Sequence, residues 1–318
     1  MFDKLIENLK AQRKTIVFTE GPDYRILSAA DRLLKENLMD VILVGNVEEV
    51  KAAAAKDGYD IAEATILDPA DYEGMDAMVD KMVELRKGKM TPEQCRASLA
   101  MGNYFGTMLV KMGLADCLLG GATYSTADTV RPALQLIKTK PGNTIVSSCF
   151  ILARGDEKIA MGDCAINIHP TEDNLVEIAQ ETAKCAETFG IDPKVAFLSF
   201  STKGSAKDDE VTKVQNAVAK AKEVMSVPVD GEMQFDAAVD MEVGQRKFPG
   251  SKVAGQANTF IFPDVTSGNI GYKIAARLGG FEAFGPILLG LNAPINDLSR
   301  GCNADEVYKM AIITAALA

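Results

Sequence analysis

Short apolar runs alternate along the chain with longer segments in which apolar residues recur every three or four positions. The short runs are rich in Val, Ile, Leu and Phe and end at Gly, Ser or Asp, which predicts buried strands. The longer segments predict amphipathic helices that pack one face on a sheet. The expected strands are 15–21, 40–45, 116–121, 144–153, 194–200 and 258–264, and the expected helices are 1–14, 25–37, 46–58, 171–187 and 208–225.

This alternation of strands and helices predicts an α/β fold with mostly parallel sheets. The 318 residues suit about two domains of roughly 150 residues each. Turn-rich segments at 140–143 and 290–294 mark candidate boundaries. Ligands of open α/β sheets bind beyond the carboxyl ends of the strands, so the loops that follow strands are the first places to search for a site.

The composition limits the partners that the protein can have. A formal net charge of −10 argues against nucleic acid or an anionic membrane surface as the main partner, because both attract clusters of Lys and Arg. Six scattered cysteines and one histidine argue against a zinc site and indicate reduced thiols in a cytoplasmic protein. No apolar run reaches about 18 residues, so we expect no membrane span.

The loop after the strand expected at 116–121 is the first candidate site. Gly120 and Gly121 let backbone amides approach a ligand closely. Ser125 or Thr126 suits the N-cap of a helix whose free N–H groups attract anions, and Arg131 within that helix can bind phosphate. An ordinary capped helix with a surface arginine fits the same pattern, and both interpretations remain open.

A second polar loop follows the strand expected at 194–200. Ser201, Thr202 and Lys203 place two hydroxyls and an ammonium where an anion can bind. The order of residues is not that of a Walker loop, and a plain solvated loop fits equally well.

A third loop follows the strand expected at 258–264. Gly268 and Asn269 predict a tight turn that opens a helix, with Lys273 on its first turn. The acids of the segment 230–236 can bind Mg²⁺ or act as bases, but acids also cap turns and helices, and no second acidic cluster accompanies them.

A hydroxyl and a guanidinium stand side by side near the carboxyl end of the chain, at Ser299 and Arg300. Arginine binds phosphate well because its planar fork donates two hydrogen bonds at once. Asp305 and Glu306 open the final helix, where a carboxylate can act as a base or simply complement the helix dipole. Cys302 has no activating base in the sequence, so we do not expect it to be a nucleophile.

Together and in this order, these segments resemble those of the phosphotransacetylases, in the phosphate acetyl/butyryltransferase family. The resemblance spans essentially the whole chain, and its two last segments are the most specific. The matching segments are Gly-Ala-Thr-Tyr-Ser-Thr-Ala-Asp-Thr-Val-Arg-Pro-Ala-Leu-Gln (121–135), Ser-Thr-Lys-Gly-Ser-Ala-Lys (201–207), Asp-Gly-Glu-Met-Gln-Phe-Asp-Ala-Ala (230–238), Phe-Pro-Asp-x3-Gly-Asn-Ile-x-Tyr-Lys (262–273) and Pro-Ile-Asn-Asp-Leu-Ser-Arg-Gly-Cys (294–302).

The resemblance implies two α/β domains with an inter-domain cleft, similar to isocitrate and isopropylmalate dehydrogenases. Domain I would comprise 1–141 plus 291–318, and domain II would comprise 142–290. The resemblance also implies a homodimer that needs no metal or organic cofactor. Its substrates would be coenzyme A, acetyl phosphate and phosphate, bound in the cleft.

The resemblance further implies roles for individual residues. Coenzyme A and acetyl phosphate would form a ternary complex in which the thiolate attacks the acetyl carbonyl directly. Ser299 and Arg300 match the pair that binds the substrate and stabilises the transition state, while Arg131 and Arg86 match phosphate-binding arginines. The family has an Asp base six residues after the site arginine, where this chain has Glu306 with Asp305 beside it, so the identity of the base stays open.

Three other functions remain to be weighed against this one. A phosphate butyryltransferase would use the same chemistry on a longer acyl group. A metal-dependent decarboxylating dehydrogenase would need a cluster of Asp ligands and a nucleotide site, neither of which is evident. A non-catalytic sensor of coenzyme A or phosphate would keep Arg131 and Arg300 but would not need Ser299.

Overall fold

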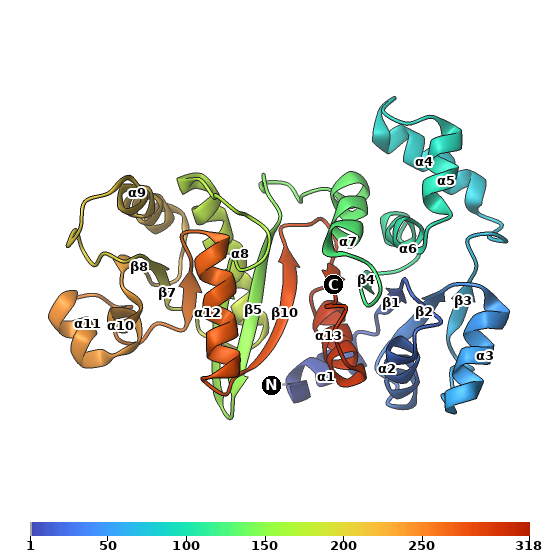
Figure 1. The fold of residues 1–318 in the computed structure, drawn as a ribbon, viewed down its shortest axis with the longest axis horizontal. Coiled ribbons are helices and arrows are strands. Elements are labelled where there is room, and N and C mark those ends of the chain that lie inside the picture. The colour runs from blue at the N-terminus through green and yellow to red at the C-terminus, as the bar shows by residue number, and fades with distance from the viewer. Residues whose placement is uncertain (1) are drawn as a thin grey trace. The chain divides into compact units, whose positions relative to one another are not determined.

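The computed structural model describes residues 2–318 (Figure 1). It divides into two compact units, the first formed by residues 1–141 with 291–318 and the second by residues 142–290. Each unit contains one sheet of mostly parallel strands with helices around it, so the predicted α/β class is confirmed.

The first unit has a five-stranded parallel sheet in the order β11-β4-β1-β2-β3. Helices α2, α3 and α13 lie on one side of this sheet and α6 on the other (Figure 1). Its elements are α1 (Phe2–Ala11), β1 (Thr15–Phe18), α2 (Tyr24–Lys35), β2 (Asp40–Val44), α3 (Val47–Asp57), β3 (Thr65–Leu67), α4 (Met75–Arg86), α5 (Pro92–Leu99), α6 (Gly102–Lys111), β4 (Cys117–Gly120), α7 (Thr126–Pro132), the π-helix η1 (Ala133–Ile137), β11 (Ile295–Asp297) and α13 (Ala304–Ala316).

The carboxyl-terminal segment completes the first unit. Strand β11 pairs with β4 in parallel, Ile295 opposite Leu118, and α13 buries eight of its residues against α2 and the sheet. The Arg32 guanidinium of α2 lies 3.5 Å from the ring centroid of Tyr308 on α13. This contact and the apolar burial fix the start of α13, which follows the turn that carries Ser299 and Arg300.

The second unit has a six-stranded sheet in the order β10-β5-β6-β9-β7-β8. Strand β5 is antiparallel to both β10 and β6, whereas β6, β9, β7 and β8 run parallel. Its elements are β5 (Ser147–Arg154), β6 (Glu157–Gly162), α8 (Glu172–Thr188), β7 (Val195–Leu198), α9 (Asp209–Val224), β8 (Val229–Met233), α10 (Phe235–Val239), α11 (Met241–Lys247), β9 (Thr259–Ile261), α12 (Val265–Arg277) and β10 (Glu282–Leu289).

Two apolar clusters hold the second unit together. Phe260 of β9 belongs to one cluster, which includes α10 and the buried Phe248 and Phe262, while Ile261 belongs to the other, which includes α8 and α9. Successive side chains of a strand point to opposite faces, so the two clusters cover the two faces of the sheet. This double burial explains why the strand here is a continuous apolar run.

No helix within the described residues 2–318 is both long and apolar enough to cross a lipid bilayer.

Candidate functional site

The carboxyl edge of the first unit's sheet is where the loops of interest meet. Strand β1 lies between β4 and β2, so the connections that leave β1 and β4 diverge to opposite sides. Such a switch point is the usual place for a ligand in an open α/β sheet. The loops that follow β1, β4 and β11 all end at this edge, because the three strands are adjacent and parallel.

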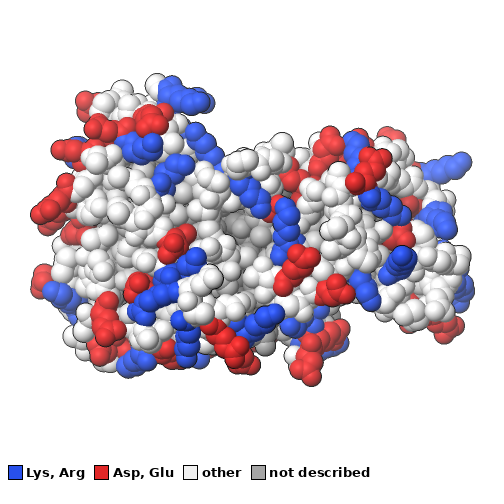
Figure 2. All heavy atoms as spheres, turned by 180° about the vertical axis from the view of Figure 1, so that it is seen from behind, with Lys and Arg blue, Asp and Glu red and all other residues white. Residues whose placement is uncertain are grey.

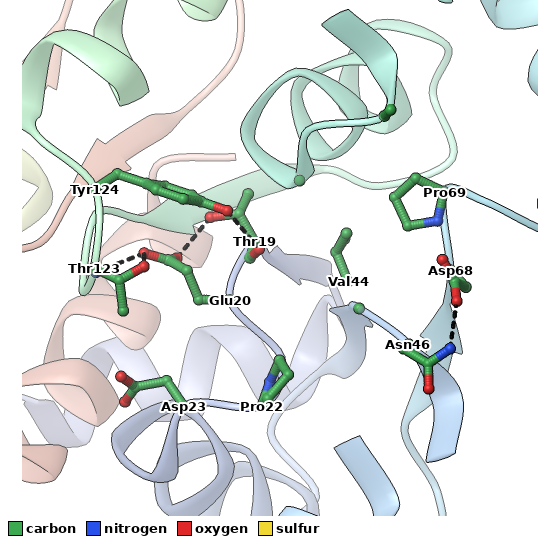
Figure 3. Close-up of a pocket in the computed structure, with 13 residues that line it drawn as sticks. Thr19, Glu20, Pro22, Asp23, Val44, Asn46, Asp68, Pro69, Thr123 and Tyr124 are labelled. Carbon is green, nitrogen blue, oxygen red and sulfur yellow. Dashed lines mark hydrogen bonds between the residues drawn. The ribbon is translucent and has the colours of Figure 1, made fainter. Parts of the chain in front are cut away.

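A pocket of about 560 Å³ opens at this edge (Figure 3). Its walls come from the loops after β1, β2, β3 and β4, and include Glu20, Asp23, Asn46, Asp68 and Tyr124. The lining contains three carboxylates and, among the described residues, no Lys or Arg. This lining by itself disfavours an anion such as phosphate in the pocket.

Glu20 braces the loop after β4 from the end of β1. Its carboxylate accepts a hydrogen bond from the backbone N–H of Gly121 at 3.0 Å. It also accepts from the backbone N–H of Thr123 at 2.9 Å and from the hydroxyl of Thr19 at 2.7 Å (Figure 3). Burial raises the pKa of Glu20, and these hydrogen bonds only partly oppose that rise. The carboxylate thereby fixes the start of the loop that leads to Ser125 and α7.

Arg25, on the first turn of α2, reaches two of the site loops. Its guanidinium is buried and pairs with Asp23, the N-cap of the same helix, at 2.8 Å. The remaining N–H groups donate to the carbonyl of Ala122, after β4, and to the carbonyls of Arg300 and Cys302, after β11. One side chain thus joins three segments that are far apart in sequence.

Ser299 and Arg300 lie on the loop between β11 and α13, and both are exposed. The loop is a tight turn in which the Cys302 N–H donates to the Ser299 carbonyl at 2.9 Å. Within the described part of the chain, the Arg300 guanidinium has no ion pair or hydrogen bond, so it is available to a ligand. Cys302 is buried, and burial raises the pKa of its thiol, which does not suit a nucleophile.

The two candidate bases have different surroundings at the start of α13. Asp305 pairs with Lys309 at 2.8 Å and with Arg32 at 3.1 Å, and the hydrogen bond from Lys309 is the main cause that lowers the pKa of Asp305. The Glu306 carboxylate accepts the N–H of Asn303 at 3.0 Å in a capping box. The two ion pairs of Asp305 therefore disfavour its taking up a proton.

Ser125 is the N-cap of α7, but its hydroxyl donates to Asp128 at 2.6 Å instead of capping the helix. Arg131 lies 3.6 Å from the same Asp128, in an exposed pair. Helix α7 has only seven residues before it widens into η1, so its N-terminus is a poor anion site. Thr126 is the first residue of α7. Asp297, at the end of β11, is buried, and this burial raises the pKa of its carboxyl group.

Arg86 and Arg131 both lie near Tyr104 of α6. Burial raises the pKa of Tyr104, and the positive charges of Arg131 and Arg86 act against that rise. The Nε atom of Arg86 is buried and has no hydrogen-bond partner among the described residues. Buried donors are normally paired, so the unpaired guanidinium nitrogen of Arg86 is available to an anion, with the positive charge of Arg131 nearby.

Ser201, Thr202 and Lys203 follow β7 in the second unit. The Glu232 carboxylate of β8 accepts the Ser201 hydroxyl at 2.8 Å and the Gly204 N–H at 2.7 Å. The Thr202 N–H donates to a neighbouring serine, and the Lys203 ammonium lies 4.9 Å from the ring centroid of Phe248. These backbone amides are occupied within the loop, so the Lys203 ammonium is the group here that can attract an anion.

The prediction that Gly268 and Asn269 form a turn opening a helix is wrong. Helix α12 begins three residues earlier, because Asp264 is its N-cap and accepts the Ser267 N–H at 2.9 Å. Lys273 is consequently on the third turn of the helix, and its ammonium donates to Asn269 at 2.6 Å. The Asn269 amide also donates to the Cys164 carbonyl, which attaches α12 to the loop after β6.

The acids of the segment 230–236 are individually paired rather than clustered. Asp230 pairs with Lys222 at 2.7 Å, Asp236 with Lys247 at 2.8 Å, and Glu232 braces the loop after β7. No group of three or more His, Cys, Asp or Glu side chains within residues 2–318 is arranged to hold a metal ion. The structure thus assigns these acids a structural role, one of the two alternatives that the sequence left open.

Comparison with known proteins decides the family. Residues 1–315 match the model of the family described as phosphate acetyl/butaryl transferase. The chain belongs to this family. The resemblance found in the sequence motifs is therefore confirmed.

Members of the phosphate acetyl/butaryl transferase family resemble the chain along its full length. The phosphate acetyltransferase of Bacillus subtilis (strain 168) is 54% identical over 319 residues, which cover 100% of this chain and 99% of the relative. The solved phosphotransacetylase from Streptococcus pyogenes has 53% identity and a TM-score of 0.97. The EutD phosphotransacetylase from Staphylococcus aureus has 50% identity and a TM-score of 0.93, and both structural comparisons cover 99% of this chain and 97% of the other.

Within this phosphate acetyl/butaryl transferase, sequence reasoning missed Glu20, Asp23 and Arg25. The signal was present, because Thr-Glu-Gly-Pro-Asp follows a buried strand and precedes an amphipathic helix. Charged residues directly after a strand lie at the ligand-binding edge of a parallel sheet. The structure brings these three residues together with the segments of Ser125 and Arg300, and it brings Asn269 together with Lys273.

Proposed function

We propose that this protein catalyses the reversible transfer of an acetyl group between acetyl phosphate and the thiol of coenzyme A. The observation that supports this most strongly is the 54% identity to the Bacillus subtilis phosphate acetyltransferase, together with the family match over residues 1–315. The exposed hydroxyl and guanidinium of Ser299 and Arg300, beside the switch point of the first sheet, agree with it.

The transfer is direct, within a complex of both substrates. The thiol gives up its proton, its sulfur forms a bond to the acetyl carbonyl carbon, and the carbon–oxygen bond to phosphate breaks. Phosphate leaves with that electron pair. Negative charge grows first on the carbonyl oxygen and then on phosphate, where Arg300 and the Ser299 hydroxyl stabilise it.

Glu306 is the base that receives the thiol proton. A free thiol has a pKa of about 8.5 and is mostly protonated at neutral pH, so a nearby carboxylate helps the reaction. The pairing of Asp305 with Lys309 and Arg32 leaves Glu306 as the better acceptor. The substitution Glu306→Gln can test this role without removing the cap, since Gln also serves in a capping box.

Arg86 and Arg131 bind phosphate groups of coenzyme A or acetyl phosphate. The unpaired buried Nε of Arg86 and the exposed, exchangeable pair between Arg131 and Asp128 support this role. Ser125, the N-cap of α7, and Thr126, the first residue of that helix, contact the substrates from the same unit. In the second unit the proposed substrate contacts are Ser201, Thr202, Lys203, Gly268, Asn269 and Lys273.

The protein acts in the cytoplasm as a homodimer and needs no metal or organic cofactor for this reaction. On the face drawn in Figure 2, acidic and basic side chains are intermixed, and the described residues form no broad basic surface there. This pattern and the net charge of −10 support small-molecule substrates rather than nucleic acid.

The test is a coenzyme A-dependent transfer assay with acetyl phosphate and butyryl phosphate. Wild type should prefer acetyl phosphate. Arg300→Ala should lower kcat/KM by about 10²–10³-fold, the usual effect of removing one group that stabilises developing charge. Arg246→Ala, which removes an exposed arginine of α11, should leave the rate unchanged. A preference for butyryl phosphate would make the protein a butyryltransferase, and binding without turnover would make it a sensor.

Substitutions of the two neighbouring carboxylates test which residue is the base. Glu306→Gln should lower kcat by about 10²–10⁴-fold, whereas Asp305→Asn should retain most of the activity. Both variants must be shown to fold by circular dichroism. A loss of activity in Asp305→Asn alone would identify Asp305 as the base. Full activity in both variants would show that neither carboxylate is the base.

A further inference from the structure

Arg25 has a complete set of hydrogen-bond partners within the first unit. Its Nε and one Nη donate to the two oxygens of Asp23, at 2.9 and 2.8 Å. The other N–H groups donate to the carbonyls of Ala122 at 2.8 Å, Arg300 at 2.8 Å and Cys302 at 3.2 Å. An arginine has five N–H donors, and each of them has an acceptor here.

These acceptors belong to two separate loops of the candidate site. Ala122 lies between Gly121 and Thr123, which Glu20 already holds, and the Leu298 N–H donates to the Gly120 carbonyl at 2.7 Å. The loops after β4 and β11 are therefore adjacent, and Arg25 lies against both. Because the guanidinium is rigid and planar, it fixes the distance between the carbonyls that it joins.

The bonds to the second loop bracket the turn that presents Arg300. The Arg300 carbonyl and the Cys302 carbonyl both accept from the same Nη of Arg25. Fixing these two peptide groups sets the plane of the turn, and with it the direction in which the exposed side chains of Ser299 and Arg300 leave the backbone. Only about 9% of the Arg25 surface is exposed, so Arg25 acts on the substrate through this turn.

We infer that Arg25 is a positioning residue for acyl transfer, which sets the place of Ser299 and Arg300 relative to the loop after β4. The inference rests on the proposed function. Lysine cannot replace Arg25 in this role, because a single ammonium cannot span the Asp23 carboxylate and both loops. Errors of about 1 Å in the placement of groups that act on the transition state cost roughly 10²-fold in rate.

The test compares Arg25→Lys with Arg13→Lys. Arg13 also pairs with an aspartate, Asp40 at 2.8 Å, but it is exposed and precedes the amino end of β1. At a temperature where both variants are folded, Arg25→Lys should lower kcat by about 10²-fold with a KM for coenzyme A close to that of wild type, the signature of a loss confined to the transition state. Arg13→Lys should keep the wild-type kcat.

Hydrogen exchange gives a second readout that does not depend on turnover. In Arg25→Lys, but not in Arg13→Lys, the amides of the segments 120–124 and 298–303 should exchange faster than in wild type. A wild-type kcat in folded Arg25→Lys overturns the inference. If wild type itself transfers no acetyl group, the proposed function fails. This outcome can be told apart from failure of the inference, in which wild type and Arg25→Lys are equally active.

Asp23→Asn keeps the inference testable if Arg25→Lys does not fold. Asparagine is as good an N-cap as aspartate, so α2 remains capped while the guanidinium loses its charged partner. The inference requires Asp23 to hold the guanidinium plane, so kcat should fall by about tenfold with KM for coenzyme A retained. An unchanged kcat in this variant would contradict it.

Discussion

Glu20 is a buried carboxylate that accepts hydrogen bonds from the backbone of the loop after β4. Burial raises the pKa of the Glu20 carboxyl group in the folded protein above its ordinary value of 4.5. The folded protein therefore retains a proton that the unfolded chain releases. Within the window from pH 4.5 up to the raised pKa, ionisation favours the unfolded state, and stability falls as pH rises.

The substitution Glu20→Gln should remove this dependence. Glutamine keeps one carbonyl oxygen for the N–H groups of Gly121 and Thr123 but does not titrate. The free energy of unfolding of wild type, minus that of Glu20→Gln, should decrease as pH rises above 4.5 and become constant above the raised pKa. Urea unfolding at a series of pH values measures it, and parallel profiles for the two proteins would refute the argument.

Among elements, α12 shows most clearly how a tertiary contact overrides a local signal. Gly268 lies inside this helix, where a Cβ atom would be 2.3 Å from the Asp163 carbonyl oxygen. Asp163 is itself buried, and its carboxylate accepts the N–H groups of Ala165 and Asn167, which fixes that backbone in place. The glycine lets α12 pack directly on the loop after β6.

Gly268→Ala should therefore lower the free energy of unfolding by about 1–3 kcal/mol, the usual cost of overpacking. At other positions inside a helix, replacing glycine by alanine normally raises the free energy of unfolding by up to about 1 kcal/mol. Gly271→Ala is the matched control in the same helix, since its Cβ would approach only the ring of Phe262, at 2.9 Å, and a side chain can move aside. Equal effects of the two substitutions in urea titrations would contradict this explanation.

The prediction of helices and strands from the sequence succeeded where apolar residues recur regularly along the chain. The strands expected at 40–45 and 194–200 and the helices at 46–58 and 208–225 correspond to β2, β7, α3 and α9. It failed where short elements depend on neighbours. Strand β8 contains Asp230, Gly231 and Glu232, which are poor strand formers. It forms because it pairs with β7 and because the Lys222 ammonium and the Ser201 hydroxyl donate hydrogen bonds to its carboxylates.

The candidate site was also predictable only in part, because some of its residues depend on neighbours that are distant in the sequence. Motifs indicated Ser299, Arg300 and Arg131, whose side chains are exposed and chemically distinctive. Glu20 and Arg25 escaped notice because the groups that tie them to the site loops are backbone groups about 100 and 275 residues away. Backbone acceptors have no sequence signature, so only the fold shows which side chain reaches them.

At the scale of the whole molecule, the second unit is a single continuous segment, residues 142–290, with its own sheet and two apolar clusters. A segment that contains its whole core can fold by itself. Expressed alone, residues 142–290 should give a cooperative urea transition with helix and strand signals in circular dichroism. A non-cooperative transition would show that this unit depends on the rest of the chain.

The first unit is assembled from two segments, and this has a consequence for protein synthesis. Strand β11 and α13, which complete its sheet and bury α2, are translated only after the whole second unit. Until then β4 is an unpaired edge, Arg25 has no loop after β11 to hold, and Arg300 has not been made. Nascent chains that stop before residue 291 should therefore contain a folded second unit and have no activity.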